Sequence, residues 1–143
     1  MDADGSHNPL EIPKLIKPII ENKADLVVGS RILGGSDEFN EKGHFLRHIA
    51  TMFVMFVINT RFKTKLTDCE DGFRAIKRPI ALSLDLNAND FDIEQEMVMK
   101  CLKKKYRVLE VPVHEYKREY GTSNINLFKI GYKFIWRLIK ELF

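Results

Sequence analysis

The first residues of the chain have the types and spacing needed for metal chemistry. Asp2 and Asp4 place two carboxylates one residue apart, and Gly5 permits a tight turn directly before a helix start. Hard cations such as Mg²⁺ or Mn²⁺ prefer oxygen ligands and commonly join one or two carboxylates to substrate phosphates. The turn therefore predicts a divalent-metal site, with an acidic turn that only caps the helix as the alternative. A calcium loop of the EF-hand type is excluded, because Pro13 stands where such a loop needs glutamate.

Other segments contain charged or hydroxyl side chains, and each is a weak signal by itself. They are Gly29–Arg31, Thr67–Arg74, Glu94–Glu96, Glu110–Val113 and Tyr120–Ser123. Taken singly, Asp68 could cap a turn, and Arg74 could pair with a neighbouring acid on the surface. A functional interpretation requires a fold that brings these segments together.

The elements that must position these residues alternate between helices and short strands. Asn8 is predicted to cap a first helix, with Glu11 returning to the cap as in a capping box and Pro18 causing a kink or break. Strands are predicted at 24–29, 72–76 and 107–113, helices at 43–59, 79–86, 90–105 and 125–143, a mobile loop at 33–42 and a second loop at 115–124. Pro112 places the last strand at a sheet edge or strand end. This alternation predicts an α/β layer structure.

Composition indicates one domain with an ordinary core. The chain has 143 residues, 45% of them hydrophobic, and a net charge of +3. So slight a charge predicts no nucleic-acid partner. Cys69 and Cys101 lack the spacing of a zinc site or a disulfide framework, which predicts reduced thiols. The opening residues do not have the pattern of a secretion signal, and the apolar run 49–58 is too short to span a bilayer.

The last predicted helix is amphipathic. Its apolar residues are Leu127, Phe128, Ile130, Phe134, Ile135, Leu138, Ile139 and Leu142. A basic stripe consists of Lys129, Lys133, Arg137 and Lys140, and Trp136 suits a headgroup boundary. The pattern predicts a helix lying in the membrane plane with its cations near anionic lipid. Packing on the domain's own core is the alternative, and for the apolar face of 43–59 the core is the favoured prediction.

Taken in order along the chain, the motifs resemble those of one enzyme family. The series 2–9, 29–31, 67–74, 94–96, 110–113 and 120–123 is similar to the inverting GT-A glycosyltransferases that include dolichol-phosphate mannosyltransferase and the polyprenyl-phosphate sugar synthases. The resemblance implies an α/β fold in which 1–124 is the C-terminal half of a Rossmann-like GT-A domain, starting at the D-x-D turn, and 125–143 is a membrane-facing helix. It also implies transfer of a sugar from a nucleotide-diphosphate sugar to a polyprenyl phosphate of the dolichyl type.

The same resemblance implies roles for individual residues. Asp2 and Asp4 would hold Mg²⁺ or Mn²⁺ on the diphosphate, where the metal stabilises the departing nucleoside diphosphate. Asp68 and Arg74 are the predicted catalytic residues, with Asp68 positioning sugar or acceptor and Arg74 contacting phosphate. Predicted substrate-binding residues are Arg31, Arg47, Arg118 and Ser123. Ser6 stands where the mannosyltransferases have glutamine, and it is left outside the predicted metal site.

The nature of the acceptor decides what catalysis is needed. A polyprenyl phosphate is already ionised at neutral pH, so positioning would supply most of the catalysis. A saccharide hydroxyl would require a carboxylate base, for which Asp68, Glu70 and Asp71 are candidates. Family members carry a nucleotide-binding half before the D-x-D turn, and we expect it from preceding residues or from a separate chain. A non-catalytic membrane-surface module is the alternative, and the expected location is the cytoplasm, at the cytoplasmic face of the membrane.

Overall fold

A three-stranded sheet forms the centre of the molecule. The computed structural model describes residues 1, 4–40, 44–117 and 127–143, and for 39–40, 44–48 and 127–130 it describes the backbone alone. The strands are β1 (Leu26–Ser30), β2 (Arg74–Ile76) and β3 (Val108–Pro112), in the order β2-β1-β3. β1 pairs antiparallel with β2 and parallel with β3. The predicted α/β class is confirmed.

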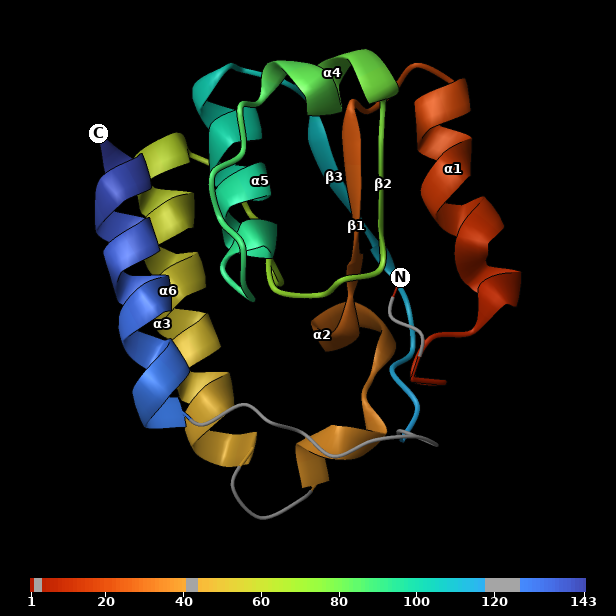
Figure 1. Cartoon of the computed structure of the whole chain (residues 1–143). Helices are drawn as coiled ribbons and strands as arrows, with labels where there is room; N and C mark the ends of the chain where they lie inside the picture. Colours follow the sequence, from red (N-terminus) through yellow and green to blue (C-terminus); the bar gives the residue numbers. More distant parts are fainter. Residues whose placement is uncertain (2–3, 41–43, 118–126) are drawn as a thin grey trace.

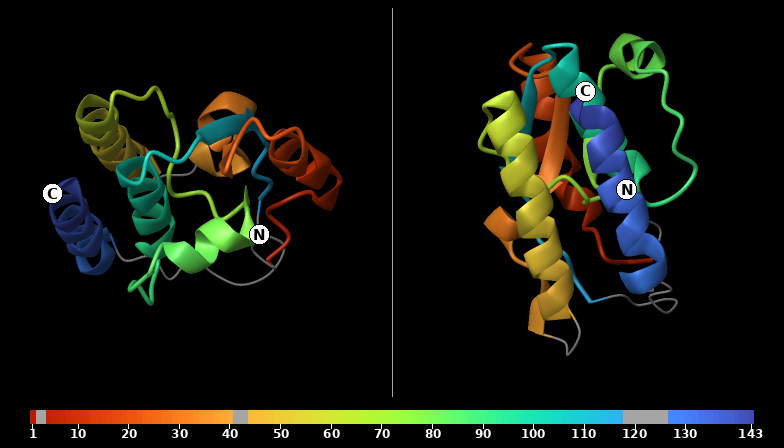
Figure 2. Two further views of the ribbon diagram at one scale, coloured as in Figure 1. Left: turned by 90° about the horizontal axis from the view of Figure 1, so that it is seen from above. Right: turned by 90° about the vertical axis from the view of Figure 1, so that its left-hand side faces the viewer.

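Helices cover both faces of this sheet. The helices are α1 (Ile12–Ile20), α2 (Arg31–Gly34), α3 (His44–Phe62), α4 (Arg78–Ser83), α5 (Ile93–Lys103) and α6 (Leu127–Leu142), with 3-10 turns η1 (Pro9–Glu11) and η2 (Asp37–Asn40). α1 lies on one face and α5 on the other, and α3 and α6 form a further layer beyond α5 (Figures 1 and 2). α3 and α6 lie side by side and run in the same direction, as Figure 1 shows.

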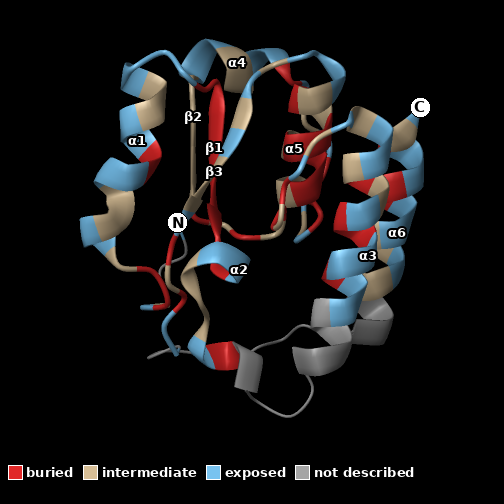
Figure 3. Ribbon diagram, turned by 180° about the vertical axis from the view of Figure 1, so that it is seen from behind, coloured by how far each residue is buried: buried red, intermediate tan, exposed pale blue. Residues whose placement is uncertain are grey.

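Alternation of side chains along β1 produces a core on each face of the sheet. Leu26 and Val28 pack with Met99 of α5 and with residues of α3, whereas Val27 packs with Leu15 of α1. All of β1 is buried, because helices cover both of its faces (Figure 3). Each fully buried aliphatic side chain contributes about 1.5–3 kcal/mol. This rigid central strand is the support for whatever follows it at Ser30.

The start of α1 differs in part from its prediction. Asn8 caps the first turn as predicted, since its side-chain oxygen accepts a hydrogen bond from Leu10 N at 3.0 Å. The predicted capping box is wrong, because the Glu11 carboxylate accepts instead from His114 N at 3.2 Å. The helix does not break at Pro18 itself, which lies in the last turn of α1, and it ends two residues later at Ile20.

The segment after β1 is more regular than the mobile loop predicted at 33–42. It contains α2 and η2, and the Ser30 hydroxyl caps α2 by accepting from Leu33 N at 3.1 Å. Gly34 lies so close to the end of β3 that an added Cβ would be 2.1 Å from the carbonyl oxygen of Val113. Close packing therefore fixes the turn that holds Arg31. Residues 41–43 lie outside the described residues.

The basic stripe predicted on α6 is wrong as a lipid-facing surface. Arg137 is 3% exposed, and its guanidinium contacts Asp92 at 2.8 Å and Glu96 at 3.0 Å. Lys133 pairs with Asp90. A buried cation is stable only beside carboxylates. These contacts therefore hold α6 against α5 and the loop before it.

An apolar surface nevertheless remains on the outer layer. Lys140 lies over the exposed ring of Trp136, whereas the Lys129 side chain lies outside the described part of the chain. The exposed apolar residues are Ile49, Met52, Phe53 and Phe56 on α3 and Tyr132, Ile135, Trp136 and Ile139 on α6. The prediction that the apolar face of α3 is core is therefore correct only for its inner side, which includes the buried Ile58.

Two smaller predictions are confirmed. Pro112 ends β3, which lies at an edge of the described sheet. Cys69 and Cys101 are buried free thiols. None of the helices in the described ranges combines the length and the apolarity that a bilayer span requires.

Candidate functional site

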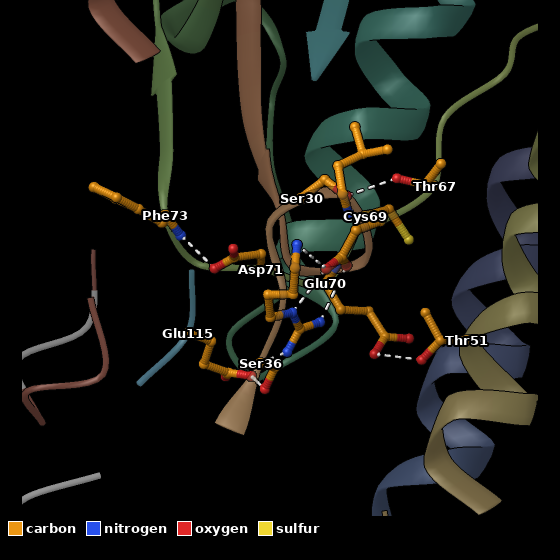
Figure 4. A network of polar contacts seen from close by, with 12 residues as sticks. Ser30, Ser36, Thr51, Thr67, Cys69, Glu70, Asp71, Phe73 and Glu115 are labelled. Carbon is orange, nitrogen blue, oxygen red and sulfur yellow. Dashed lines mark hydrogen bonds and ion pairs between the residues drawn. The ribbon is translucent and has the colours of Figure 1, made fainter. Parts of the chain in front are cut away.

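The predicted site residues that the structure describes gather where β1 and β3 end. Parallel strands bring their carboxyl ends to one edge of a sheet, where ligands of α/β proteins bind. The antiparallel β2 begins at that edge, so the loop 67–73 before it lies beside Ser30 and Glu115 (Figure 4). The Ser30 and Thr67 hydroxyls are 2.7 Å apart and join the end of β1 to this loop.

Asp68 is the second residue of this loop and is held by Arg31. The Arg31 guanidinium donates from Nε to Asp68 Oδ2 at 2.7 Å and from Nη2 to Oδ1 at 3.1 Å. Asp68 is 1% exposed and Arg31 is 8% exposed. Arg31 Nη1 also lies 3.5 Å from Glu115 Oε1. Two buried carboxylates therefore surround one buried guanidinium, in the two-pronged geometry that arginine favours.

This pairing decides the protonation state of Asp68. Burial by itself raises the pKa of the Asp68 carboxyl, but the charge and the hydrogen bonds of Arg31 outweigh burial, and the pKa is lowered. A general base is most effective when its pKa lies near the working pH. Asp68 is therefore held as a carboxylate by Arg31 and is poorly suited to removing a proton from a sugar hydroxyl.

Glu110 of β3 holds the 67–73 loop through its carboxylate, a role that the sequence did not predict. Its carboxylate accepts from Thr67 N at 2.8 Å, from Asp68 N at 2.6 Å and from the Thr67 hydroxyl at 3.1 Å. Burial raises the pKa of Glu110. The signal that could have revealed this role is a lone acidic residue among the apolar residues of β3.

The guanidinium of Arg74 makes its hydrogen bonds within the protein. Its three guanidinium nitrogens donate to backbone carbonyls: Nε to Asp71 O at 3.0 Å, Nη1 to Glu94 O at 2.9 Å and Nη2 to Cys69 O at 3.2 Å. Burial lowers the pKa of Arg74. The contacts fix both ends of the 69–71 segment and join it to α5. The structure thus gives Arg74 a supporting position, and the predicted phosphate contact stays a prediction.

The acidic turn at the start of the chain lies at the same end of the sheet. Gly5 has a φ of +86°, the left-handed conformation that a tight turn needs. Asp4 Oδ1 accepts from Ser6 N at 3.0 Å and from the Ser6 hydroxyl at 2.6 Å, and Ser6 O accepts from Tyr116 N at 2.9 Å. Ser6 therefore orients the carboxylate of Asp4. The backbone of Ser6 is in turn hydrogen-bonded to the segment after β3.

The oxygen donors of this turn fit a hard divalent cation. Mg²⁺ keeps several waters and takes only one or two carboxylates besides substrate phosphates. Among the described side chains, no three His, Cys, Asp or Glu residues cluster as a metal site built wholly from protein would require. The Asp4 carboxylate is an oxygen ligand of the kind that such a cation takes. Asp2 lies outside the described residues.

A buried contact connects the turn to the Asp68 loop. His7 Nε2 lies 2.9 Å from Asp71 Oδ1, and the His7 ring stacks on Phe73 with centroids 4.8 Å apart. Neither residue was singled out for this role by the sequence. The remaining predicted substrate residues cannot be compared with the site, because Arg118, Ser123 and the side chain of Arg47 lie outside the described parts of the chain.

The protein-family model described as "Glycosyl transferase family 2" matches residues 1–84 of this chain. That range includes the acidic turn, β1 with Arg31, the Asp68 loop and Arg74. The chain belongs to glycosyl transferase family 2, and the resemblance inferred from the motifs is confirmed.

Several known glycosyltransferases are similar to this chain over almost its whole length. UDP-N-acetylglucosamine–dolichyl-phosphate N-acetylglucosaminyltransferase of Methanococcus voltae is 30% identical over 96% of the chain and 55% of that protein. Undecaprenyl-phosphate mannosyltransferase of Micrococcus luteus is 28% identical over 88% of the chain and 51% of that protein. Dolichol-phosphate mannosyltransferase of Pyrococcus furiosus is 32% identical over 98% of the chain and 40% of that protein. The chain spans about half the length of the relatives it matches.

Proposed function

We propose that the chain is part of a metal-dependent glycosyltransferase that moves a sugar from a nucleotide-diphosphate sugar to a polyprenyl phosphate. The observation that supports this most strongly is that the acidic turn of Asp4 and the buried Asp68–Arg31 pair meet at the carboxyl ends of β1 and β3. The similar proteins whose names specify dolichyl or undecaprenyl phosphate support the choice of acceptor.

In this proposal the residues of the chain act by positioning. Asp4, with Asp2, would hold Mg²⁺ or Mn²⁺, which would supply charge stabilisation to the departing nucleoside diphosphate. Asp68 would orient the sugar or the acceptor, since Arg31 and Glu110 fix its carboxylate and its backbone. A phosphate acceptor needs no base, which agrees with the lowered pKa of Asp68.

The outer layer suits contact with a membrane surface. Its exposed apolar side chains belong to α3 and α6, the two helices that lie beyond α5 from the sheet (Figure 2). Trp136 and Tyr132 have the amphipathic rings that favour the headgroup region. A polyprenyl acceptor is confined to the bilayer, so docking of this layer would bring the site near its substrate. The cytoplasmic face remains a prediction.

Two exposed surfaces support the proposal that a nucleotide-binding half packs against this chain. β2 lies at an edge of the described sheet, and an unpaired edge can accept another strand. Beside it, α1 presents an open apolar groove lined by residues that include Ile12, Ile16 and Ile20. A nucleotide-binding half, in the same polypeptide or a separate chain, would cover these surfaces.

The acceptor can be tested by competition. The chain, with a nucleotide-binding half supplied in fusion or in trans, is incubated with labelled nucleotide sugars, a short polyprenyl phosphate and a saccharide. We expect label in the polyprenyl phosphate fraction. Label recovered only in the saccharide would refute the proposed acceptor.

A further inference from the structure

His7 and Asp71 form a buried contact that the proposed reaction does not use. Their side chains are 2% and 1% exposed, and they belong to the acidic turn and to the loop after Asp68. Two ionisable side chains are stable in such a place only if each finds a partner. The contact therefore resists any displacement of one segment from the other.

The Asp71 side of this contact is rigid. Its Oδ1 also accepts a hydrogen bond from Phe73 N at 2.9 Å, which fixes the side-chain rotamer (Figure 4). Its backbone carbonyl accepts from Arg74 Nε at 3.0 Å. Among the described residues, Asp71 Oδ2 is buried without a hydrogen-bond partner, and the 2.9 Å approach of His7 Nε2 to Asp71 Oδ1 is a close contact that lacks hydrogen-bond geometry. The carboxylate is thus held for its contact with His7 at the cost of one unsatisfied oxygen.

The His7 side of the contact is rigid as well. The ring stacks on Phe73 with an interplanar angle of 20°, and the backbone forms a bridge with Glu115. His7 follows Ser6, whose two hydrogen bonds orient the Asp4 carboxylate. Asp4 is thus linked through Ser6 and the adjacent His7 to Asp71. Asp71 lies three positions after Asp68 in the same loop.

We propose that His7 and Asp71 are positioning residues, which set the acidic turn at the place where a metal held by Asp4 acts on the same substrate as Asp68. The inference rests on the proposed function, because it takes Asp4 as a metal ligand. Partners that hydrogen-bond a metal ligand typically affect metal affinity about 10- to 100-fold, and His7 and Asp71 act on Asp4 through such a partner, Ser6.

Conservative variants separate positioning from folding. His7→Phe keeps a ring to stack on Phe73 but removes the nitrogen that meets Asp71. Asp71→Asn keeps an oxygen for Phe73 N but removes the charge. The matched control is Asp25→Asn, which alters a buried carboxylate paired with Arg107 and Lys77 at the opposite end of β1.

The measurement is a Mn²⁺ titration of the isotope-labelled full chain, followed by paramagnetic broadening of its amide NMR signals. We expect His7→Phe and Asp71→Asn each to weaken Mn²⁺ binding about 10- to 100-fold. The double variant should bind no more weakly than either single variant, because both remove the same contact. Asp25→Asn should leave Mn²⁺ affinity unchanged while lowering the unfolding temperature. If a single variant fails to fold, the double variant, in which both polar partners are replaced, gives the result.

The outcomes separate this inference from the proposed function. Mn²⁺ binding that Asp4→Asn abolishes but that the His7 and Asp71 variants leave unchanged would overturn the positioning role and leave the metal site standing. If the unaltered chain shows no broadening that depends on Asp4, the metal part of the proposed function and this inference both fail.

Discussion

Replacing Arg31 with methionine would leave the Asp68 carboxylate buried without its charged partner. Asp68 is 1% exposed, and Arg31→Met removes two hydrogen bonds of 2.7 and 3.1 Å from it. A bond from Glu70 N at 3.0 Å remains. Breaking a buried ion pair by removing one partner costs about 3–5 kcal/mol. Since domains of this size are stable by about 5–15 kcal/mol, we expect a large part of the free energy of unfolding to be lost.

The loss should depend on pH in a defined direction. In the unaltered chain the folded pKa of Asp68 is lowered below its unfolded value of about 3.9. Its stabilising contribution is therefore present above that value and is lost as pH falls through the folded pKa. In Arg31→Met, burial is opposed only by backbone hydrogen bonds and raises the pKa relative to the unaltered chain, so protonation relieves part of the cost. The difference in stability between the two proteins should shrink as pH falls.

Urea unfolding followed by circular dichroism, at pH 7 and at acidic pH, measures this difference. The control is Lys14→Met, which removes an ion pair with Glu11 whose lysine side chain is 52% exposed, and which should cost at most about 1 kcal/mol. A loss for Arg31→Met as small as that of the control, or one that does not change with pH, would refute the buried-pair interpretation.

Three further predictions concern the loop and the outer layer. Glu110→Ala should lower the free energy of unfolding by about 1–3 kcal/mol, and Glu110→Gln by less, because glutamine keeps one acceptor for the loop amides; urea unfolding distinguishes them. Arg137→Met should destabilise the domain by about 3–5 kcal/mol, since it leaves the buried Asp92 carboxylate without its charged partner, whereas Lys140→Met should have little effect on the unfolding temperature. Trp136→Ser with Ile139→Ser should weaken co-sedimentation with liposomes without lowering the unfolding temperature; unchanged sedimentation would exclude this surface as the membrane contact.

Local signals in the sequence predicted the central elements well. The strand at β1 follows from a continuous apolar run that ends in glycine, and the helices from apolar residues at helical spacing. The edge position of β3 follows from Pro112, which has no N–H for a further strand. Each of these signals depends on residues near one another in the chain, so no knowledge of tertiary contacts is needed.

The errors occurred where distant residues decide the structure. Arg137 was predicted to face lipid, because its spacing from neighbouring lysines gives no information about the carboxylates of α5 that surround it. The sequence also does not show that Arg31 donates to Asp68 and Arg74 to backbone carbonyls, whereas the predicted roles of both in substrate binding stay predictions. Glu110 was overlooked, since its role depends on a loop about forty residues earlier in the chain.

The site was predicted with the same limits. The motifs identified Asp4 and Asp68 as chemically important, and the fold brings their segments to one edge of the sheet. The contact between His7 and Asp71 could not be foreseen, because it joins two segments whose relative position only the sheet defines. The paired aspartates and the Asp68 loop therefore give the class of reaction, while the supporting residues require the structure.

The most direct test of the proposed function is metal-dependent sugar transfer that requires the acidic turn. The chain, supplied with the nucleotide-binding half that the proposal expects, is assayed for transfer of labelled sugar to a polyprenyl phosphate, with Mn²⁺ and with chelator. We predict transfer that chelator abolishes, that Asp4→Asn reduces at least about 100-fold, as expected for a metal ligand, and that Glu21→Gln at the exposed end of α1 leaves unchanged. Transfer that proceeds equally in Asp4→Asn, or in the presence of chelator, would contradict the proposed function.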